Sequence, residues 1–250
     1  MSDESNTRKE QNIRTNNFYI NEFTEKENFK LLAKVLASKI ENHEIKRICD
    51  VGCATGELLC YLIRSFGKDN IDYYGIDVNE QYISLCKERI PNCNFIKGDI
   101  YEGILLSEER RFDCVTFFGT LCLFSDFKQV FRNLLSLLRS EGYLYVFSPF
   151  NQYGYHVKYE YIHRATNGKM IKDVEYTCSI EEISEWLEER NMSYIWHSFR
   201  MPIDIIHSNE KYPVRAWTEL LNSGERITRD AIDRIQEQFL LEIRVGSKNS

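Results

Sequence analysis

Residues 50 to 56, DVGCATG, place one carboxylate and two glycines at the end of an apolar run. Because glycine has no Cβ, Gly52 and Gly56 allow a tight turn and let a ligand approach backbone N–H groups. The apolar pattern over 56–66 predicts a helix, and a helix N-terminus carries partial positive charge. The segment therefore predicts a ligand-binding turn between a strand and a helix.

Two phosphate-binding patterns do not fit this turn. The dinucleotide fingerprint needs a glycine where Ala54 stands, which argues against a nicotinamide-dependent reductase. A Walker loop needs Lys followed by Ser or Thr after the second glycine, but Glu57 and Leu58 occupy those positions. Since Glu57 would repel a pyrophosphate, we expect a ligand without one.

The elements that must position this turn follow an alternating order. Apolar runs typical of buried strands alternate with helical patterns, which predicts a parallel sheet covered by helices on both faces. Later segments predict a helix at 179–190 and strands at 193–199 and 237–245, so the sheet should finish in an antiparallel pair. The earlier strands are expected at 46–51, 71–77, 93–96, 112–118 and 142–148, and helices at 25–42, 56–66, 79–89 and 127–138.

Residues 46–149 resemble the class I S-adenosylmethionine-dependent methyltransferases. The family's first motif is an acid followed by x-G-x-G-x-G with a replaceable middle glycine, and Asp50 to Gly56 fits it. Four further segments follow in the family's order: YYGIDVNEQYISLCKER, NFIKGDI, FDCVTFFGTLCLF and LLRSEGYLYVFSP. The resemblance implies an α/β fold with a Rossmann-like, seven-stranded, mostly parallel sheet, an antiparallel last strand and helices on both faces.

The resemblance also implies S-adenosylmethionine as the cofactor and S-adenosylhomocysteine as its product. Asp77, at the end of the second strand, would accept from both ribose hydroxyls, and Asp99 from the adenine amino group. Val78 and Ile100 would enclose the adenine, and Asp50 would help to bind the ammonium group. The predicted cofactor-binding residues are Asp50, Gly52, Gly56, Asp77, Val78, Asp99, Ile100, Phe118 and Gly119.

Less can be said of the acceptor side. Residues 151–177 and 201–235 break the alternating rhythm, and we interpret them as insertions that cover the acceptor. The candidates there are of two kinds, a general base and groups that bind substrate, and packing or surface roles stay open for each of them. His156 and His163 are the candidate bases, and Tyr155, Arg200 and Arg215 are the candidate substrate residues.

Composition narrows the class of protein further. The 250 residues are 43% hydrophobic and carry a net charge of −6, so we do not expect a nucleic-acid partner. The eight cysteines include no CxxC pair, so we expect reduced thiols and no metal site. The sequence lacks an apolar run of about 18 residues, so we do not expect a membrane-spanning helix. We expect a cytoplasmic monomer or homodimer, with 1–17 a disordered or lid-forming tail and 18–250 a single domain.

The sequence therefore predicts an enzyme that moves a methyl group to a small molecule, with oxygen favoured as the accepting atom. A saccharide, a natural product or an anionic metabolite would each suit. Two alternatives stay open: a methyltransferase acting on protein or RNA, and a non-catalytic partner subunit that only binds the cofactor. The reaction itself asks mainly for positioning and exclusion of water.

Overall fold

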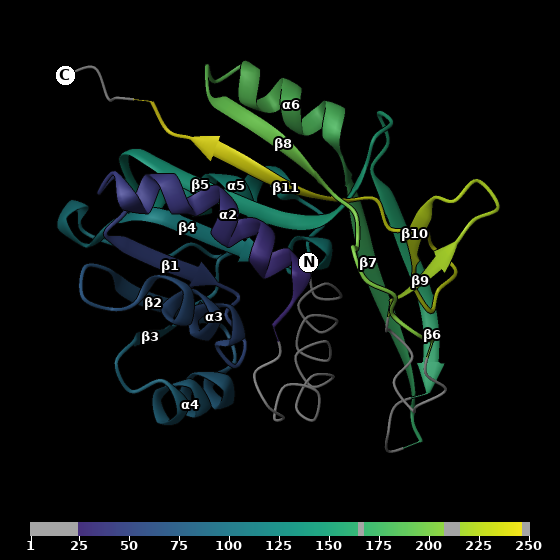
Figure 1. Cartoon of the computed structure of the whole chain (residues 1–250), viewed down its shortest axis with the longest axis horizontal. Helices are drawn as coiled ribbons and strands as arrows, with labels where there is room; N and C mark the ends of the chain where they lie inside the picture. Colours follow the sequence, from purple (N-terminus) through teal and green to yellow (C-terminus); the bar gives the residue numbers. More distant parts are fainter. Residues whose placement is uncertain (1–24, 165–167, 208–215, 247–250) are drawn as a thin grey trace.

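The computed structural model describes residues 25–164, 168–207 and 216–246, and a nine-stranded sheet forms the centre of this part of the chain (Figure 1). Seven strands lie in the order β3-β2-β1-β4-β5-β11-β8, and β7 joins β5 to β6. The strands are β1 Arg47–Val51, β2 Asp72–Asp77, β3 Asn94–Lys97, β4 Phe112–Phe118, β5 Leu138–Asn151, β6 Val157–Arg164, β7 Met170–Ser179, β8 Ser193–Phe199 and β11 Gln238–Arg244. The helices are α2 Glu27–Glu41, α3 Glu57–Phe66, α4 Glu80–Arg89, α5 Phe127–Ser136 and α6 Ile180–Glu188, with short 3-10 helices η1 Glu108–Arg110 and η2 Leu121–Leu123.

The seven-strand path confirms the predicted sheet. Strands β1 to β5 pair in parallel, whereas β11 runs antiparallel to both β5 and β8. The order of the strands reverses between β1 and β4, because β2 and β3 lie on one side of β1 and β4 and β5 on the other. In open α/β sheets, ligands bind outside the carboxyl ends of the strands at such a reversal.

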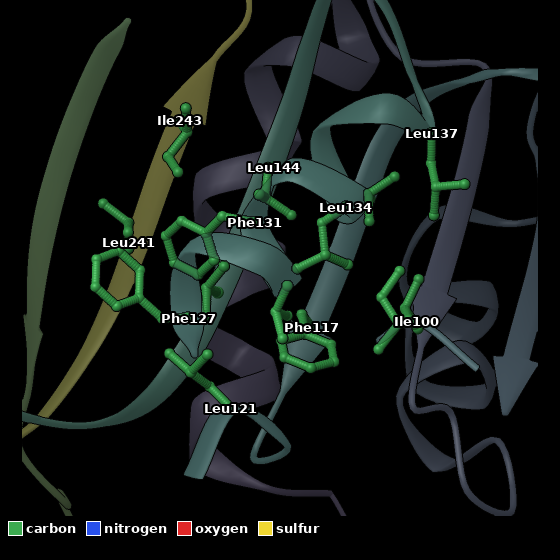
Figure 2. Close-up of a cluster of buried hydrophobic side chains, with 14 of the residues drawn as sticks. Ile100, Phe117, Leu121, Phe127, Phe131, Leu134, Leu137, Leu144, Leu241 and Ile243 are labelled. Carbon is green, nitrogen blue, oxygen red and sulfur yellow. The ribbon is translucent and has the colours of Figure 1, made fainter. Parts of the chain in front are cut away.

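Helices cover both faces of the sheet. On one face α5 and α6 pack against β4, β5 and β11, and Figure 2 shows the side chains of α5 directed at the sheet. Asp126 caps α5 by accepting from the N–H of Gln129, and four apolar residues at helical spacing are buried against the sheet. Burial of each such side chain contributes roughly 1.5–3 kcal/mol. The four are Phe127, Val130, Phe131 and Leu134.

The second face carries α2, α3 and α4. Helix α2 buries Phe29, Leu32 and Leu36 there, and α3 and α4 contribute side chains to the same core. The amino end of α2 and the first turn of α3 therefore lie beside the carboxyl ends of the strands, where the order of the sheet reverses.

Residues 151–177 and 201–235 contain more regular structure than we predicted. β6 and β7 form an antiparallel pair, here called the β6–β7 ribbon, and a second pair consists of β9 Trp217–Leu220 and β10 Arg226–Arg229. Figure 1 shows the ribbon extending from the end of β5, with β9 and β10 beside it. The sequence pattern did not reveal these strands, because the buried face of the ribbon is largely polar and so does not alternate between apolar and polar residues.

Three properties of the described residues bear on the earlier expectations. All eight cysteines lie in the described ranges and are free thiols. No cluster of three or more His, Cys, Asp or Glu side chains in these ranges could hold a metal ion. Within them, no helix has the length and apolar character needed to cross a membrane.

Candidate active site

A cavity of about 370 Å³ opens at the carboxyl ends of β1, β2 and β4. Its described walls come from the turn between β1 and α3, the loops after β2, β3 and β4, and the residues that begin α2. All the predicted cofactor-binding residues except Gly56 line it. The parallel sheet thus brings together predicted cofactor-binding residues that lie up to 69 positions apart in the sequence, from Asp50 to Gly119.

Hydrogen bonds from its backbone N–H groups to the end of β2 hold the turn after β1 in place. The N–H of Gly52 donates to the carbonyl of Ile76 at 2.8 Å, and the N–H of Ala54 donates to Asp77 Oδ2 at 2.9 Å. Gly52 has φ +70°, and a Cβ there would lie 2.7 Å from Thr120 Oγ1. The close approach that Gly52 permits is therefore to Thr120, and the N–H groups of Gly52 and Ala54, which we expected to face a ligand, donate within the protein.

Gly56 does not line the cavity. It is the N-cap residue of α3 with φ +81°, and a Cβ there would lie 2.6 Å from Ile90 Cδ1. The close approach that this glycine permits is to the end of α4, not to a ligand. Contact of Gly56 with the cofactor stays a prediction, and the structure places this residue beside the cavity lining and not in it.

Asp77 faces the cavity and also ties two segments together. Its Oδ2 accepts from Ala54 and its Oδ1 accepts from the N–H of Asn79 at 2.8 Å. Burial raises the pKa of Asp77 above its ordinary value, and the backbone N–H groups that it accepts act in the opposite direction. Each carboxylate oxygen has a second lone pair, so the group keeps the capacity to accept from two hydroxyls.

Two apolar side chains face the same space from neighbouring loops. Val78 is 40% exposed and Ile100 is almost fully buried, and both line the cavity together with Asp99. Asn133 of α5 donates to the carbonyls of Ile100 at 2.7 Å and Tyr101 at 3.0 Å, which holds this loop in place. Asn133 could not be predicted from the sequence, because the carbonyls to which it donates are 32 and 33 positions away.

Asp50 is the most deeply buried carboxylate of the cavity, with 3% exposure. Burial raises its pKa to about 7, a hydrogen bond from Thr116 lowers it, the charge of Asp77 raises it, and Lys26 lowers it. Lys26 also lines the cavity, where it pairs with Glu57 at 2.5 Å. Our sequence-based reasoning missed Thr116 and Lys26.

The loop after β4 closes the cavity on its apolar side. Gly119 has φ +67°, and its N–H donates to the carbonyl of Phe147 at 2.8 Å. The ring of Phe118 stacks on Phe147 with 5.4 Å between centroids and also approaches Phe29 of α2. These contacts fix the loop against both β5 and α2.

The two histidines that we considered as bases do not line the cavity. His156 contacts Glu182 through Nε2, while its Nδ1 accepts from the N–H of Ser179 at 3.4 Å, so both ring nitrogens have partners. His163 lies on β6, where Nε2 is 2.5 Å from Asp173 Oδ2. The structure therefore does not bring either ring to the predicted cofactor residues. The other three, His43, His197 and His207, do not line the cavity either, and all five histidines are in the described ranges.

The candidate substrate residues also lie elsewhere. Tyr155 is 72% exposed in the loop between β5 and β6. Arg200 pairs with Glu225 at 2.8 Å near the β9–β10 pair. Arg215 and the tail 1–17 fall outside the described residues.

Comparison with known proteins decides the family. Residues 42–195 match the family model described as a methyltransferase domain, which is more than half of the chain. The chain belongs to the methyltransferase-domain family. The predicted family and enzyme class are thereby confirmed, and S-adenosylmethionine as cofactor agrees with them.

Individual methyltransferases are similar to this chain at low identity. The malonyl-[acyl-carrier protein] O-methyltransferase 2 of Ilyobacter polytropus is 22% identical over 84% of this chain and 83% of its own length. The trans-aconitate 2-methyltransferase of Escherichia coli is 28% identical over 46% of this chain and 44% of its own. A solved structure described as a complex of DhpI with SAH covers 98% of this chain and 96% of its own, with TM-score 0.56 and 13% identity, and so shows the shared fold.

The aligned parts of the relatives differ in extent. Three curated relatives are aligned over 58%, 83% and 44% of their own lengths, so this chain spans less than two thirds of two of them. The family assignment thus rests on the matched domain, and the identity of the acceptor is a separate question.

The residues of the cavity fit S-adenosylmethionine. Asp77 has acceptor capacity for hydroxyls, Val78 and Ile100 offer apolar surface for a planar base, and Asp50 offers a buried carboxylate for an ammonium group. Glu57 at the start of α3 suits a ligand without a pyrophosphate. This methyltransferase domain therefore combines hydrogen-bond acceptors and apolar surface that fit the cofactor.

Proposed function

We propose that this methyltransferase transfers the methyl group of S-adenosylmethionine to a carboxylate oxygen of a small molecule, which forms a methyl ester. In this proposal Asp77 binds the ribose hydroxyls, Asp99 the adenine, and Asp50 the ammonium group. Val78 and Ile100 enclose the base, while Gly52 and the Phe118–Gly119 loop border the methionine end. When bound, the cofactor supplies an electrophilic methyl group, and this chain's residues position the acceptor and exclude water.

The observation that carries the proposal is the position of the histidines. All five lie in the described ranges, and none lines the cavity. An alcohol acceptor needs a base to remove its proton, and histidine is the commonest such group. A carboxylate is already ionised near neutral pH, so it can attack without a base. Its negative charge is also attracted to the positive charge of the cofactor.

The names of two relatives support the same class of acceptor. One acts on malonyl-[acyl-carrier protein] as an O-methyltransferase, and the other methylates trans-aconitate. Malonyl and aconitate groups both carry carboxyl groups. The shared chemistry favours a carboxylate over a sugar hydroxyl, and it leaves open whether the acid is free or tethered to a carrier protein.

The alkali stability of the product tests this proposal. The protein is incubated with methyl-labelled S-adenosylmethionine and a panel of mono-, di- and tricarboxylic acids, offered both free and as carrier-protein thioesters. Methyl esters release labelled methanol in mild alkali, whereas ethers and methylamines retain the label. We expect acceptor-dependent label that is lost in alkali.

The controls separate the possible failures. Binding of S-adenosylhomocysteine is measured first by calorimetry, so that a failure to bind the cofactor is not mistaken for an acceptor of the wrong class. Alkali-stable label on a metabolite, on polypeptide or on RNA would refute the carboxylate proposal while leaving the cofactor role intact. The His156→Ala variant should form the ester at the wild-type rate.

A further inference from the structure

Thr116 stands directly beside Asp50 in the sheet. β1 and β4 pair in parallel with Asp50 opposite Thr116, and both residues are almost completely buried. Thr116 is the one hydroxyl-bearing residue of β4, whose sequence is FDCVTFF. A buried hydroxyl costs free energy unless it is hydrogen-bonded, so its place in this strand requires a partner.

That partner is the carboxylate of Asp50. Thr116 Oγ1 donates to Asp50 Oδ1 at 2.7 Å. Asp50 Oδ2 accepts no hydrogen bond from any described residue, and Asp50 lines the cavity. One oxygen is thus fixed by the neighbouring strand while the side chain borders the space for the ligand.

We propose that Thr116 is a positioning residue for cofactor binding: it fixes the Asp50 carboxylate so that the second oxygen receives the ammonium group of the cofactor. This inference rests on the proposed function, because it assumes that the amino-acid end of the cofactor lies at Asp50. Thr116 itself contacts the carboxylate and not the ligand.

The charges around Asp50 make the contribution of Thr116 measurable. The negative charge of Asp77, at the end of β2, disfavours ionisation of Asp50, and the positive charge of Lys26, before α2, favours it. The thiols of Cys53 and Cys114 also lie near this carboxylate. Because burial already raises the pKa of Asp50 to about 7, loss of the Thr116 hydrogen bond should raise it further.

The test compares two ligands that differ only at the amino-acid end. S-adenosylhomocysteine has the ammonium group, and 5′-methylthioadenosine lacks it. Their dissociation constants are measured by calorimetry between about pH 5.5 and pH 8.5 for the wild type, Thr116→Val, Thr116→Ser and Asp50→Asn. Valine keeps the shape of threonine and removes the donor, whereas serine keeps the donor. Thr116→Ala takes the place of the valine variant if that protein does not fold.

We expect Thr116→Val to weaken S-adenosylhomocysteine binding roughly ten-fold near pH 6.5, with methylthioadenosine binding unchanged. The pH at which affinity for S-adenosylhomocysteine is half-maximal should rise, and Thr116→Ser should restore the wild-type profile. Asp50→Asn should weaken S-adenosylhomocysteine most at pH 8.5 and least at pH 5.5, where Asp50 of the wild type is already largely protonated.

Several results would overturn the inference. An equal loss for both ligands would mean that Thr116 only supports the fold, and an unshifted pH profile would mean that it does not act through Asp50. If Asp50→Asn lowers affinity but Thr116→Val does not, only the role of Thr116 fails. If the wild type does not bind S-adenosylhomocysteine, the proposed function fails with it.

Discussion

The cavity and the β6–β7 ribbon both bury charged side chains, but they balance those charges differently. Glu175 of the ribbon accepts at 2.8 Å from Arg234, which lies after β10 and also donates to Asp230 at 2.7 Å, and His163 pairs with Asp173 within the ribbon. Around the cavity, Asp50, Asp77 and Asp99 accept from neutral backbone or hydroxyl groups instead. The fourth described carboxylate of the cavity, Glu57, pairs with Lys26. The charges on the ribbon are therefore neutralised by ionic partners within the protein, while Asp50 and Asp77 keep acceptor capacity for a ligand.

The difference teaches how to separate a structural polar network from a binding site. Burial and ionisable residues are common to both regions, and the ribbon holds His163 and Arg164, whereas the described lining of the cavity contains neither histidine nor arginine. What distinguishes the cavity is open volume beside groups whose hydrogen-bonding capacity is incomplete. The following variants probe that distinction, beginning with the largest expected effect.

Arg234→Ala should destabilise the fold strongly without affecting the cofactor. Removal of the guanidinium leaves the buried carboxylates of Glu175 and Asp230 uncompensated, which costs about 3–5 kcal/mol of unfolding free energy in urea titrations. Arg226→Ala, which breaks an exposed pair with Asp204, should cost less than about 1 kcal/mol. Weaker S-adenosylhomocysteine binding by the folded Arg234→Ala protein would show that the two regions are not separate.

Asp77→Ala should weaken S-adenosylhomocysteine binding by about 2–3 kcal/mol, roughly 30-fold to 150-fold. The matched control is Asp113→Ala, because Asp113 also accepts two backbone N–H groups, from Lys46 and Arg47, but does not line the cavity. Calorimetry should show unchanged affinity for that control. An equal loss in both variants would assign Asp77 a purely structural role.

Gly56→Ala should lower the unfolding free energy by about 2 kcal/mol, from the positive φ and the clash with Ile90 together. Gly224 also has a positive φ, +84°, and no atom lies within 4 Å of a Cβ built there, so Gly224→Ala should cost only about 1 kcal/mol. The difference measures the contact of α3 with α4. A Gly56→Ala protein of normal stability that no longer binds S-adenosylhomocysteine would contradict our placement of Gly56 outside the cavity.

His156→Ala should have the smallest effect. The ring lies against Phe127 and Glu182 away from the cavity, so turnover should stay within about two-fold and stability within about 1 kcal/mol. Initial rates under saturating cofactor and acceptor provide the measurement. A loss of turnover with normal folding would restore His156 as a candidate base.

The fold and the cavity residues at the carboxyl ends of the strands were predictable from the sequence, because both depend on local patterns. Asp50, Asp77 and Asp99 each stand at or near a strand end, and a parallel sheet places those ends at one edge. The hydroxyl of Thr116 was not predictable, since its partner is 66 positions away and the strand around it is apolar. For His156 and His163 the residue type suggested a catalytic base. Only the structure shows that their rings contact Glu182 and Asp173.

The ribbon shows why the second half of the chain was harder to interpret. Tyr159, Tyr161 and His163 share one face with Asp173 and Glu175, so the face that packs inward consists of groups normally found outside. A pattern of alternating polarity assumes an apolar interior, and this interior is an ionic one.

The buried carboxylate of Asp50 has a calorimetric consequence. With its pKa at about 7, a sizeable fraction of the cofactor-free protein carries a proton on Asp50 at neutral pH. An ammonium group at that carboxylate favours the ionised form, so binding must release part of a proton to the solution. The buffer takes up that proton, and the heat of binding should therefore differ between phosphate and Tris by an amount that vanishes in Asp50→Asn.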